Sequence, residues 1–231
     1  MSEAARASLR AGIAAGTPFA VAAGLLAVSF GVLAEPVLGA APAVVMSAIV
    51  FAGSAQFAAL AVLAAGGDPA AAVIAGILLN ARYIPMGIAL APSLRGGPLR
   101  RALIGQGMVD ASWAMAMRDK GRFDPAFMVG ATLPSYPFWV GGTLAGVLVG
   151  DSIGDPGALG LDALFPAFFL GLLIGGEPLT GRRTVAAALL GGAIAAALLP
   201  FAPPGVPIIA ASAAALIGLA PERPPAREAR T

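Results

Sequence analysis

The sequence predicts an all-α integral membrane protein, a bundle of about seven or eight transmembrane helices of which some are broken. Two observations lead to this prediction. Hydrophobic residues make up 58% of the chain and charged residues only 11%, whereas a soluble domain carries roughly 25% charged residues. The apolar residues also gather in runs close to the roughly 20 residues that a helix needs to cross a bilayer. A bilayer is therefore the expected solvent.

Windows of about 19 residues place the expected crossings at 13–34, 43–65, 70–90, 102–117, 126–149, 159–177, 184–200 and 206–220. Short turn-forming pieces separate several of them, such as G-G-D-P at 66–69 and R-G-G-P at 95–98. None of the connections is long enough for a soluble domain, so residues 1–220 are predicted to form a single membrane domain. Residues 221–231 are proline-rich and charged and are predicted to form a disordered tail.

The individual spans differ in what they carry. The first is a long apolar run behind Arg6 and Arg10, and the fifth, seventh and eighth contain no charged residue. The second and third hold the polar groups described below. The fourth, at 102–117, is short and contains Gln106 and Asp110, which is typical of a half-helix. That segment decides whether the chain crosses seven or eight times.

Basic residues indicate an orientation. With eight crossings most of them fall on one side, which the positive-inside rule identifies as the cytoplasm: Arg6, Arg10, Arg118, Lys120, Arg122, Arg182, Arg183, Arg223, Arg227 and Arg230. The N-terminus is therefore expected in the cytoplasm. Arg95, Arg100 and Arg101 are exceptions, because eight crossings place them outside. Since the arginines mark loops in small groups, no nucleic-acid partner is expected.

The composition also excludes several kinds of chemistry. The chain has no cysteine and no histidine, so thiolate or imidazole metal sites, Cys or His nucleophiles and disulfides are ruled out. The single lysine, Lys120, lacks the glycine-rich frame of a P-loop. Neither an enzyme nor a cofactor is expected. Any work that the chain does must be driven by a gradient, by the membrane potential or by a partner.

A shift of 115 residues relates the two halves of the chain. It aligns G-V-L at 31–33 with G-V-L at 146–148, and the hydropathy repeats at the same shift. Internal repeats are common in secondary transporters, which bind solute where the repeats meet. Duplication is one construction that fits the chain. Whether its two repeats would be parallel or inverted depends on whether the fourth segment crosses the membrane.

Arg82 is the most informative residue of the third span. It lies in N-A-R-Y at 80–83 and is followed by Pro85, which removes a backbone hydrogen bond and kinks or unwinds a helix. Carbonyls freed in this way, together with Asn80 and the guanidinium of Arg82, would form a receptor for a carboxylate. The alternative is that Arg82 lies near a helix end and extends to the interface.

The second span carries F-A-G-S-A-Q-F at 51–57. Gly53 permits close helix approach or a break, while Ser54 and Gln56 supply hydrogen bonds. Gln56 favours function over packing, because lipid satisfies none of the hydrogen-bonding sites of a primary amide. Small residues that only pack helices together are the alternative.

Asp110 and Asp162 are the acidic candidates, with proton coupling or ammonium recognition as their expected roles. An intramembrane aspartyl protease would need two such carboxylates, but its G-x-G-D context is missing. Asp162 could instead cap a helix. Pro166 is expected to break the sixth span. The aromatic residues near span ends are interpreted as interfacial anchors: Trp113, Tyr136 and Trp139.

The order and spacing of these motifs resemble the AzlC-type (azaleucine-resistance) family of branched-chain amino-acid permeases, from about Thr17 to Gly218. The matching pieces are the stretch from Ser47 through Gln56 and Phe57, which includes S-A-Q-F at 54–57, then G-G-D-P at 66–69, N-A-R-Y at 80–83, Asp110 and G-L-D-A-L-F-P-A at 160–167. Two positions depart from the family pattern: Ala111 follows Asp110 where a glutamate is usual, and Ala163 follows Asp162 where a phenylalanine is usual. These departures bear on coupling and substrate range more than on the fold.

The resemblance implies a bacterial inner-membrane exporter of leucine, isoleucine, valine or related amino acids that works with a small AzlD-type membrane subunit. Together with the residues above, it predicts proton-coupled export of neutral amino acids. The substrate-binding residues are expected to be Ser54, Gln56, Asn80 and Arg82, which converge with Asp110 near mid-membrane. Alternatives are a scaffold or accessory subunit without transport, a permease for another small solute, and a homodimer that works alone. A channel is disfavoured, because no ring of charge or carbonyl filter is visible.

Overall fold

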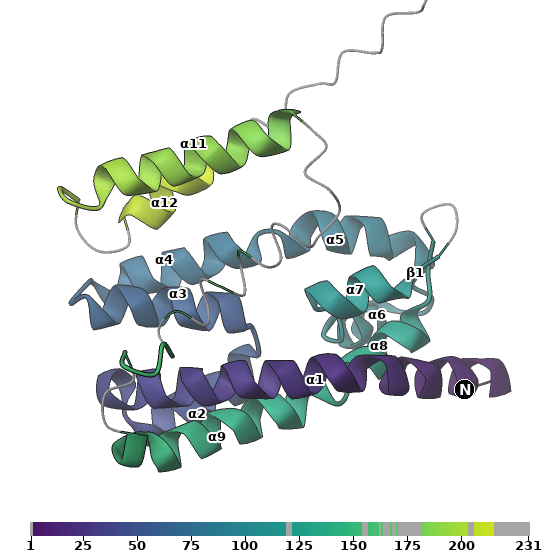
Figure 1. The fold of residues 1–231 in the computed structure, drawn as a ribbon. Helices are drawn as coiled ribbons and strands as arrows, with labels where there is room; N and C mark the ends of the chain where they lie inside the picture. The colour runs from purple at the N-terminus through teal and green to yellow at the C-terminus, as the bar shows by residue number, and fades with distance from the viewer. Residues whose placement is uncertain are drawn as a thin grey trace, which may run out of the picture.

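The computed structural model describes residues 2–118, 122–153, 157–161, 163, 167, 170, 182–202 and 206–214. Helices dominate this part of the chain (Figure 1): α1 (Glu3–Leu38), α2 (Ala40–Val50), α3 (Gly53–Ala64), α4 (Pro69–Asn80), α5 (Tyr83–Leu90), the 3-10 turn η1 (Ala91–Ser93), α6 (Pro98–Gly105), α7 (Asp110–Ala116), α8 (Pro125–Thr132), α9 (Ser135–Ile153), α11 (Arg182–Leu198) and α12 (Val206–Ser212). Two-residue strands β1 (Met117–Arg118) and β2 (Arg122–Phe123) pair antiparallel. The predicted all-α class is confirmed.

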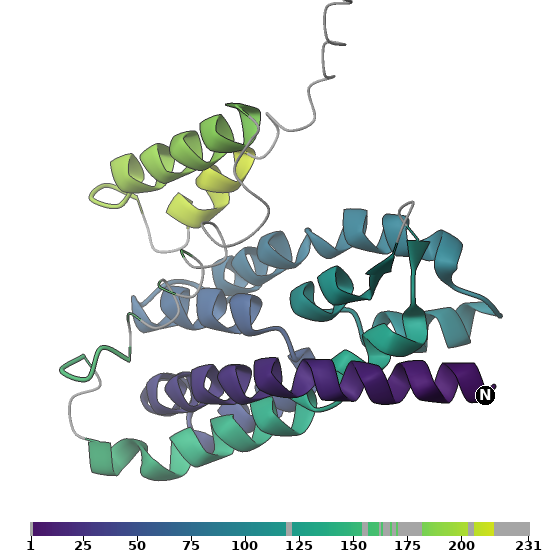
Figure 2. The same ribbon diagram turned by 45° about the vertical axis from the view of Figure 1, so that its right-hand side comes forward.

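α1 and the α8–α9 segment lie side by side, as Figures 1 and 2 both show. Glycines allow the two backbones to touch. A Cβ added to Gly16 would lie 2.0 Å from the carbonyl oxygen of Ala131, and one added to Gly31 would lie 2.2 Å from that of Thr143. Because the residue numbers rise together along both helices, the helices run parallel. Close backbone approach at small residues is a common way to join helices in lipid.

The register of this pair matches the offset noted in the sequence. Gly16 meets Ala131, and Gly31 meets Gly146, so in both contacts the partners are 115 positions apart (131 − 16 and 146 − 31). Related positions of the two halves therefore lie against each other. The construction from two repeats stays a prediction, because much of the second half lies outside the described residues.

The expected crossing at 43–65 is a hairpin of two short helices, which corrects the prediction of a single span. α2 ends at Val50, the next residue Phe51 has a left-handed φ of 43°, and α3 starts at Gly53. The two helices then run antiparallel, since Gln56 bonds to Ser47. The chain enters the bundle, reverses at Phe51–Ala52 and leaves by the same end. The predicted break at Gly53 follows from this turn.

The segment Pro69–Ser93 is, with α1, one of two described helical segments that are long and apolar enough to cross a bilayer. It contains α4, α5 and η1, and it is interrupted at Ala81 and Arg82. α4 packs antiparallel on α3 after the turn at 65–68. α11 and α12 pack on each other, and α12 contacts α4 (Figure 1).

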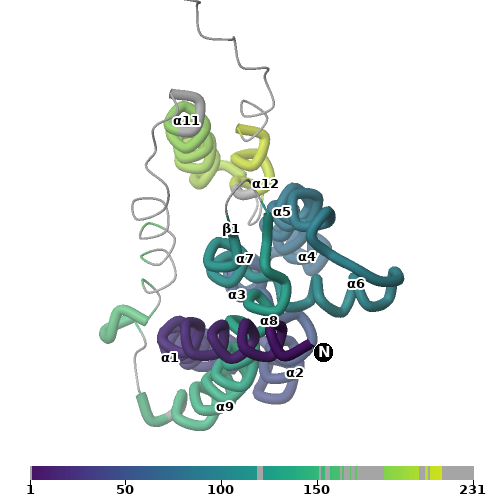
Figure 3. Tube along the Cα trace, turned by 90° about the vertical axis from the view of Figure 1, so that its right-hand side faces the viewer, coloured from purple at the N-terminus to yellow at the C-terminus, as the bar shows by residue number. Residues whose placement is uncertain are grey.

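The segment 102–117 does not cross the bundle. Arg100 near the start of α6 and Arg118 just after α7 line one common cavity with Arg95 and Arg122, so both ends of the segment lie at the end of the bundle where α1 begins (Figure 3). The sequence prediction placed Arg95, Arg100 and Arg101 opposite Arg118. The structure corrects this for Arg95 and Arg100, and it does so because α6–α7 is a hairpin.

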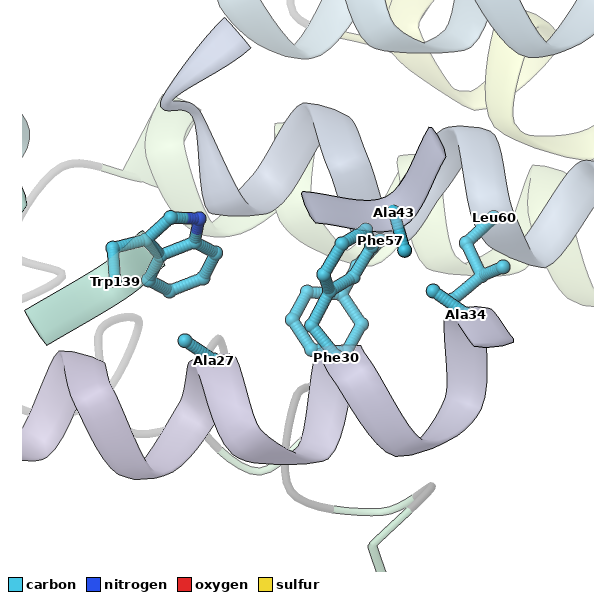
Figure 4. Packing of buried hydrophobic residues seen from close by; sticks show 7 residues of the cluster. All are labelled: Ala27, Phe30, Ala34, Ala43, Phe57, Leu60 and Trp139. Atoms are coloured by element: carbon cyan, nitrogen blue, oxygen red, sulfur yellow. The ribbon is translucent and has the colours of Figure 1, made fainter. Parts of the chain in front are cut away.

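The main hydrophobic core joins the α2–α3 hairpin to α1 and α9 (Figure 4). Phe30 and Phe57 meet edge to face with ring centroids 5.3 Å apart, and aromatic pairs favour this arrangement. The cluster consists of Ala27, Phe30, Ala34, Ala43, Phe57, Leu60 and Trp139. It holds α3 rigidly beside α1, which positions the start of α3. Asp162, Pro166 and the predicted tail at 221–231 lie outside the described residues.

Candidate functional site

Arg82 lies at the interruption between α4 and α5. Pro85 has no N–H with which to bond the carbonyl of Ala81 four residues earlier, and its ring crowds that carbonyl. The N–H of Ile84 bonds to the Ala81 carbonyl instead, at 3.0 Å. The helix therefore breaks just before Pro85, as the sequence predicts. The break turns the side chain of Arg82 toward α3 and α7.

The guanidinium of Arg82 forms a two-pronged ion pair with Asp110. Nε donates to Oδ1 and Nη2 donates to Oδ2, both at 2.9 Å. Nη2 also donates to the hydroxyl of Ser54 at 2.9 Å, and Nη1 donates to the carbonyl of Leu79 at 2.7 Å. The guanidinium carbon lies 4.9 Å from the centre of the Tyr83 ring. Such charge-assisted, two-pronged contacts fix geometry as well as charge.

Three helix breaks meet at this ion pair. Ser54 is in the first turn of α3 after the left-handed Phe51, Arg82 separates α4 from α5, and Asp110 begins α7. The α2–α3 hairpin enters from the end where α1 finishes, and the α6–α7 hairpin enters from the end where α1 starts. Broken helices that meet at mid-membrane are typical of solute sites in secondary transporters. Of the five residues that the sequence analysis expected to converge, the structure brings Ser54, Arg82 and Asp110 together.

A cavity of about 470 Å³ opens beside the ion pair, within the size range of small-molecule sites. The walls come from α1, the turn after α2 with the start of α3, the break between α4 and α5, the start of α7 and the start of α9. The lining residues are Phe19, Ala22, Ala23, Leu26, Phe51, Ala52, Gly53, Ser54, Arg82, Tyr83, Val109, Asp110, Ala111, Ser135 and Trp139. Most of this lining is apolar, so the ion pair is the charged spot in an otherwise apolar chamber.

The ion pair stays partly accessible from the cavity. The Arg82 side chain is 32% exposed and the Asp110 side chain 41%, so a bound molecule can reach both charges. The N-terminal end of α3, which no side chain caps, also borders the cavity. Backbone N–H groups at such an end favour a carboxylate. The site therefore offers cationic and N–H groups beside one carboxylate. Within the described residues no cluster of three metal-ligating side chains is found.

Two predicted site residues lie elsewhere. Gln56 is fully buried behind the cavity wall, where it bonds to Ser47 and Trp139, so it does not line the cavity. Its place follows from helix geometry, because Ser54 and Gln56 are two positions apart and face different sides of α3. Asn80 lines a separate groove on α2, α3 and α4. Its Oδ1 is buried without a hydrogen-bond partner among the described residues.

The aromatic residues expected as interfacial anchors lie in different surroundings. Trp139 is only 7% exposed and lines the cavity, which corrects that expectation. Trp113 donates to the Met86 carbonyl and packs on Phe123. The exposed Tyr136 donates to the carbonyl of Ala48. Sequence reasoning missed Trp139 because position near a span end does not indicate which helix face a side chain occupies.

Apolar helices, breaks that meet inside the bundle and a chamber with one ion pair together define a helical membrane protein of the transport class. The chain belongs to the AzlC protein family, whose model matches residues 18–153. This is a transport family and not a family of enzymes. A transport-related role in a membrane follows for this chain.

Three relatives illustrate the similarity. The "Inner membrane protein YgaZ" of Escherichia coli (strain K12) is 31% identical over 72% of each chain. An "Uncharacterized membrane protein" of Archaeoglobus fulgidus is 32% identical over 90% of this chain and 92% of its own length. The "Branched-chain amino acid transport protein AzlC" of Bacillus subtilis (strain 168) is 30% identical over 57% of this chain and 52% of its own. No solved structure matches the chain.

Proposed function

We propose that this protein exports branched-chain and other neutral amino acids across the bacterial inner membrane, coupled to protons. The observation that carries the proposal is the Arg82–Asp110 ion pair in an apolar chamber. The Bacillus subtilis relative is named for branched-chain amino acid transport, and the Escherichia coli relative is named as an inner membrane protein. The first name agrees with a solute that is zwitterionic and apolar at once, and the second agrees with the proposed membrane.

The ion pair has the charges that an amino-acid zwitterion needs. The substrate carboxylate takes the place of the Asp110 carboxylate on Arg82, where the guanidinium can bind it with two prongs. The substrate ammonium then faces Asp110, so that neither protein charge is left unpaired. This exchange matters because an uncompensated charge in the membrane costs at least ~2.5–3.5 kcal/mol on insertion scales. An anion or a cation alone would leave one charge of the site without a partner.

The apolar walls receive the substrate side chain. Phe19 and Leu26 of α1 and the indole of Trp139 border the chamber, and they suit an aliphatic group better than a polar one. An apolar pocket separates neighbouring substrates by only ~1–3 kcal/mol per methylene. We therefore expect a preference among aliphatic amino acids, not strict selection of one.

The two hairpins provide the access routes. α2–α3 carries Ser54 to the site from one end of the bundle, and α6–α7 carries Asp110 to it from the other. Movement of one hairpin away from Arg82 opens the chamber toward that end while the other stays closed. Protonation of Asp110 would weaken its bonds to Arg82, which couples this opening to a proton.

The charged ends support the proposed orientation. Arg6 and Arg10 of α1 share an end of the bundle with Arg95, Arg100, Arg118 and Arg122, and the positive-inside rule assigns that end to the cytoplasm. Substrate then enters past α6–α7 and leaves past α2–α3.

The groove on α2, α3 and α4 is the proposed seat of the small AzlD-type subunit. Its rim includes Ile77 and Ile84, 63% and 66% exposed, and the side chain of Asn80 also lines it. Lipid offers a primary amide no hydrogen-bond partner, whereas a polar group of a partner helix in the groove would. Asn80→Leu should reduce co-purification of the subunit in mild detergent, while Gln106→Leu, the same kind of change outside the groove, should not. Equal recovery contradicts this seat.

Counterflow of labelled leucine in proteoliposomes tests the function. Wild type with its partner should exchange leucine, and Arg82→Ala should abolish the exchange. Equal flux in both proteins would disprove the assigned site. No flux from wild type with its partner present would instead favour a scaffold without transport.

A further inference from the structure

A closed ring of four hydrogen bonds lies behind the chamber wall. The indole Nε1 of Trp139 donates to Oε1 of Gln56, and Nε2 of Gln56 donates to the Ser47 hydroxyl, both at 2.9 Å. The Ser47 and Thr143 hydroxyl oxygens are 2.7 Å apart, and the Thr143 hydroxyl donates to the Trp139 carbonyl at 3.0 Å. Each hydroxyl thus uses its single proton, with Ser47 donating to Thr143. The ring joins α2, α3 and α9.

The ring is shielded from solvent. Gln56, Ser47 and Thr143 are 0% exposed, and Trp139 is 7% exposed. A polar group that loses its partner in such a place pays the full cost of desolvation, so the four bonds hold one arrangement. Gly53 adds a steric stop, because a Cβ there would lie 2.6 Å from the indole atom Cη2. The plane of the Trp139 indole is therefore fixed from two sides, by its hydrogen bond to Gln56 and by its contact with Gly53.

We propose that Gln56 is a positioning residue that sets side-chain selectivity, because it holds the indole of Trp139 as a wall of the Arg82–Asp110 chamber. Trp139 lines the chamber and Gln56 does not, so Gln56 acts on the chamber through the residues that it bonds, and of these Trp139 is the one that forms its wall. The fixed position of the indole follows from the contacts above, whereas its effect on selectivity rests on the proposed function.

Loss of the Gln56 acceptor has a definite consequence for the indole. The N–H must find another acceptor or stay unpaired, and the chamber is the open space beside it. The indole then turns toward the chamber and makes it shallower. A long side chain such as that of leucine loses its room, while alanine still fits. Selectivity for leucine over alanine should fall by about tenfold, the value of one well-packed methylene.

Fluorescence tests the fixed indole without any transport. The chain has two tryptophans, so Trp113→Phe leaves Trp139 as the sole emitter. In this background Gln56→Leu should shift the emission to longer wavelength and increase quenching by acrylamide. Gln106→Leu, a matched change outside the ring, should do neither. Unchanged emission from the Gln56 variant, in protein that elutes as a single species, overturns the proposal.

Counterflow of labelled leucine and of labelled alanine tests the consequence. Gln56→Leu should lower the leucine-to-alanine ratio, and Gln106→Leu should leave it unchanged. A shifted emission with an unchanged ratio overturns the role in selectivity. If wild type itself moves neither amino acid, the proposed function fails, while the fluorescence result still decides whether Gln56 holds Trp139.

Discussion

Arg82 and Asp110 face each other with two parallel hydrogen bonds of 2.9 Å, although they lie on different broken helices. The pair is where the α6–α7 hairpin meets the α4–α5 segment. Since the Ser54 hydroxyl accepts from the same guanidinium, both hairpins depend on Arg82. A molecule that competes for this guanidinium thus acts on both hairpins at once.

Arg82→Lys should lower leucine counterflow by about tenfold or more, even though the charge is kept. A lysine ammonium cannot form two parallel bonds to one carboxylate, and a hydrogen bond to a charged group is worth about 1.5–3 kcal/mol. Proteoliposomes with labelled leucine provide the measurement. Arg10→Lys, at the exposed start of α1, is the control and should transport as wild type does. If both variants transport equally, two-pronged binding is not needed.

Asp110→Asn should leave only reduced leucine exchange and no response to an imposed pH gradient. The amide gives the substrate ammonium no countercharge and accepts only one of the two hydrogen bonds from Arg82, and it cannot take up a proton in the membrane. Uptake driven by a pH gradient, compared with exchange at equal pH, separates the two effects. If the response to the pH gradient falls only in proportion to exchange, Asp110 does not carry the coupling proton.

Gly142→Ala should lower the apparent Tm, while Gly141→Ala should not. A Cβ at Gly142 would lie 2.4 Å from the Gly24 carbonyl oxygen, whereas one at Gly141 meets nothing within 4 Å. Overpacking costs typically about 1–3 kcal/mol, or roughly 2–4 °C of Tm per kcal/mol in a chain of this size. Thermal unfolding in detergent measures the difference. Equal Tm values for these neighbours would contradict the close contact of α1 and α9.

Asp124 should make stability depend on pH at the end of the bundle where α1 begins. Burial alone would raise the pKa of Asp124, but bonds from Ser8 and from the N–H groups of Phe127 and Ala126, with the charge of Arg118, together lower it. The ionised form therefore stabilises the fold above the ordinary pKa of an aspartate, and this contribution is lost as the pH falls through the lowered value.

Asp124→Asn tests this dependence, because asparagine still caps α8 but carries no charge. The Tm of wild type should exceed that of the variant near pH 7, and the gap should close as the pH falls below the ordinary pKa of an aspartate and through the lowered value. Ser8→Ala, which removes one of the bonds, should give an intermediate gap. A gap that is constant with pH would show that the charge of Asp124 contributes nothing.

Much of the fold could be predicted from local chemistry. Composition and apolar run length decided the class, since they set which solvent the helices need. Pro85 predicted the break beside Arg82, because a missing N–H acts on the carbonyl four residues earlier wherever the helix lies. Arg82 and Asp110 were predicted as site residues because an ionised side chain is expensive to place in lipid without partners, and Ser54 because it supplies a hydrogen bond there.

Only the tertiary structure decided which polar residues share a site. Gln56 and Ser54 are two positions apart on α3, yet one bonds the Trp139 indole behind the wall and the other bonds Arg82 in the chamber. The expected spans at 43–65 and 102–117 became hairpins for a similar reason. An apolar run has the same hydropathy whether it crosses or reverses, and the reversal at Phe51 is held by packing on Tyr136. Hydropathy depends on composition along the chain, whereas the direction of a segment and the side to which each of its residues points depend on contacts between segments that are far apart in the sequence.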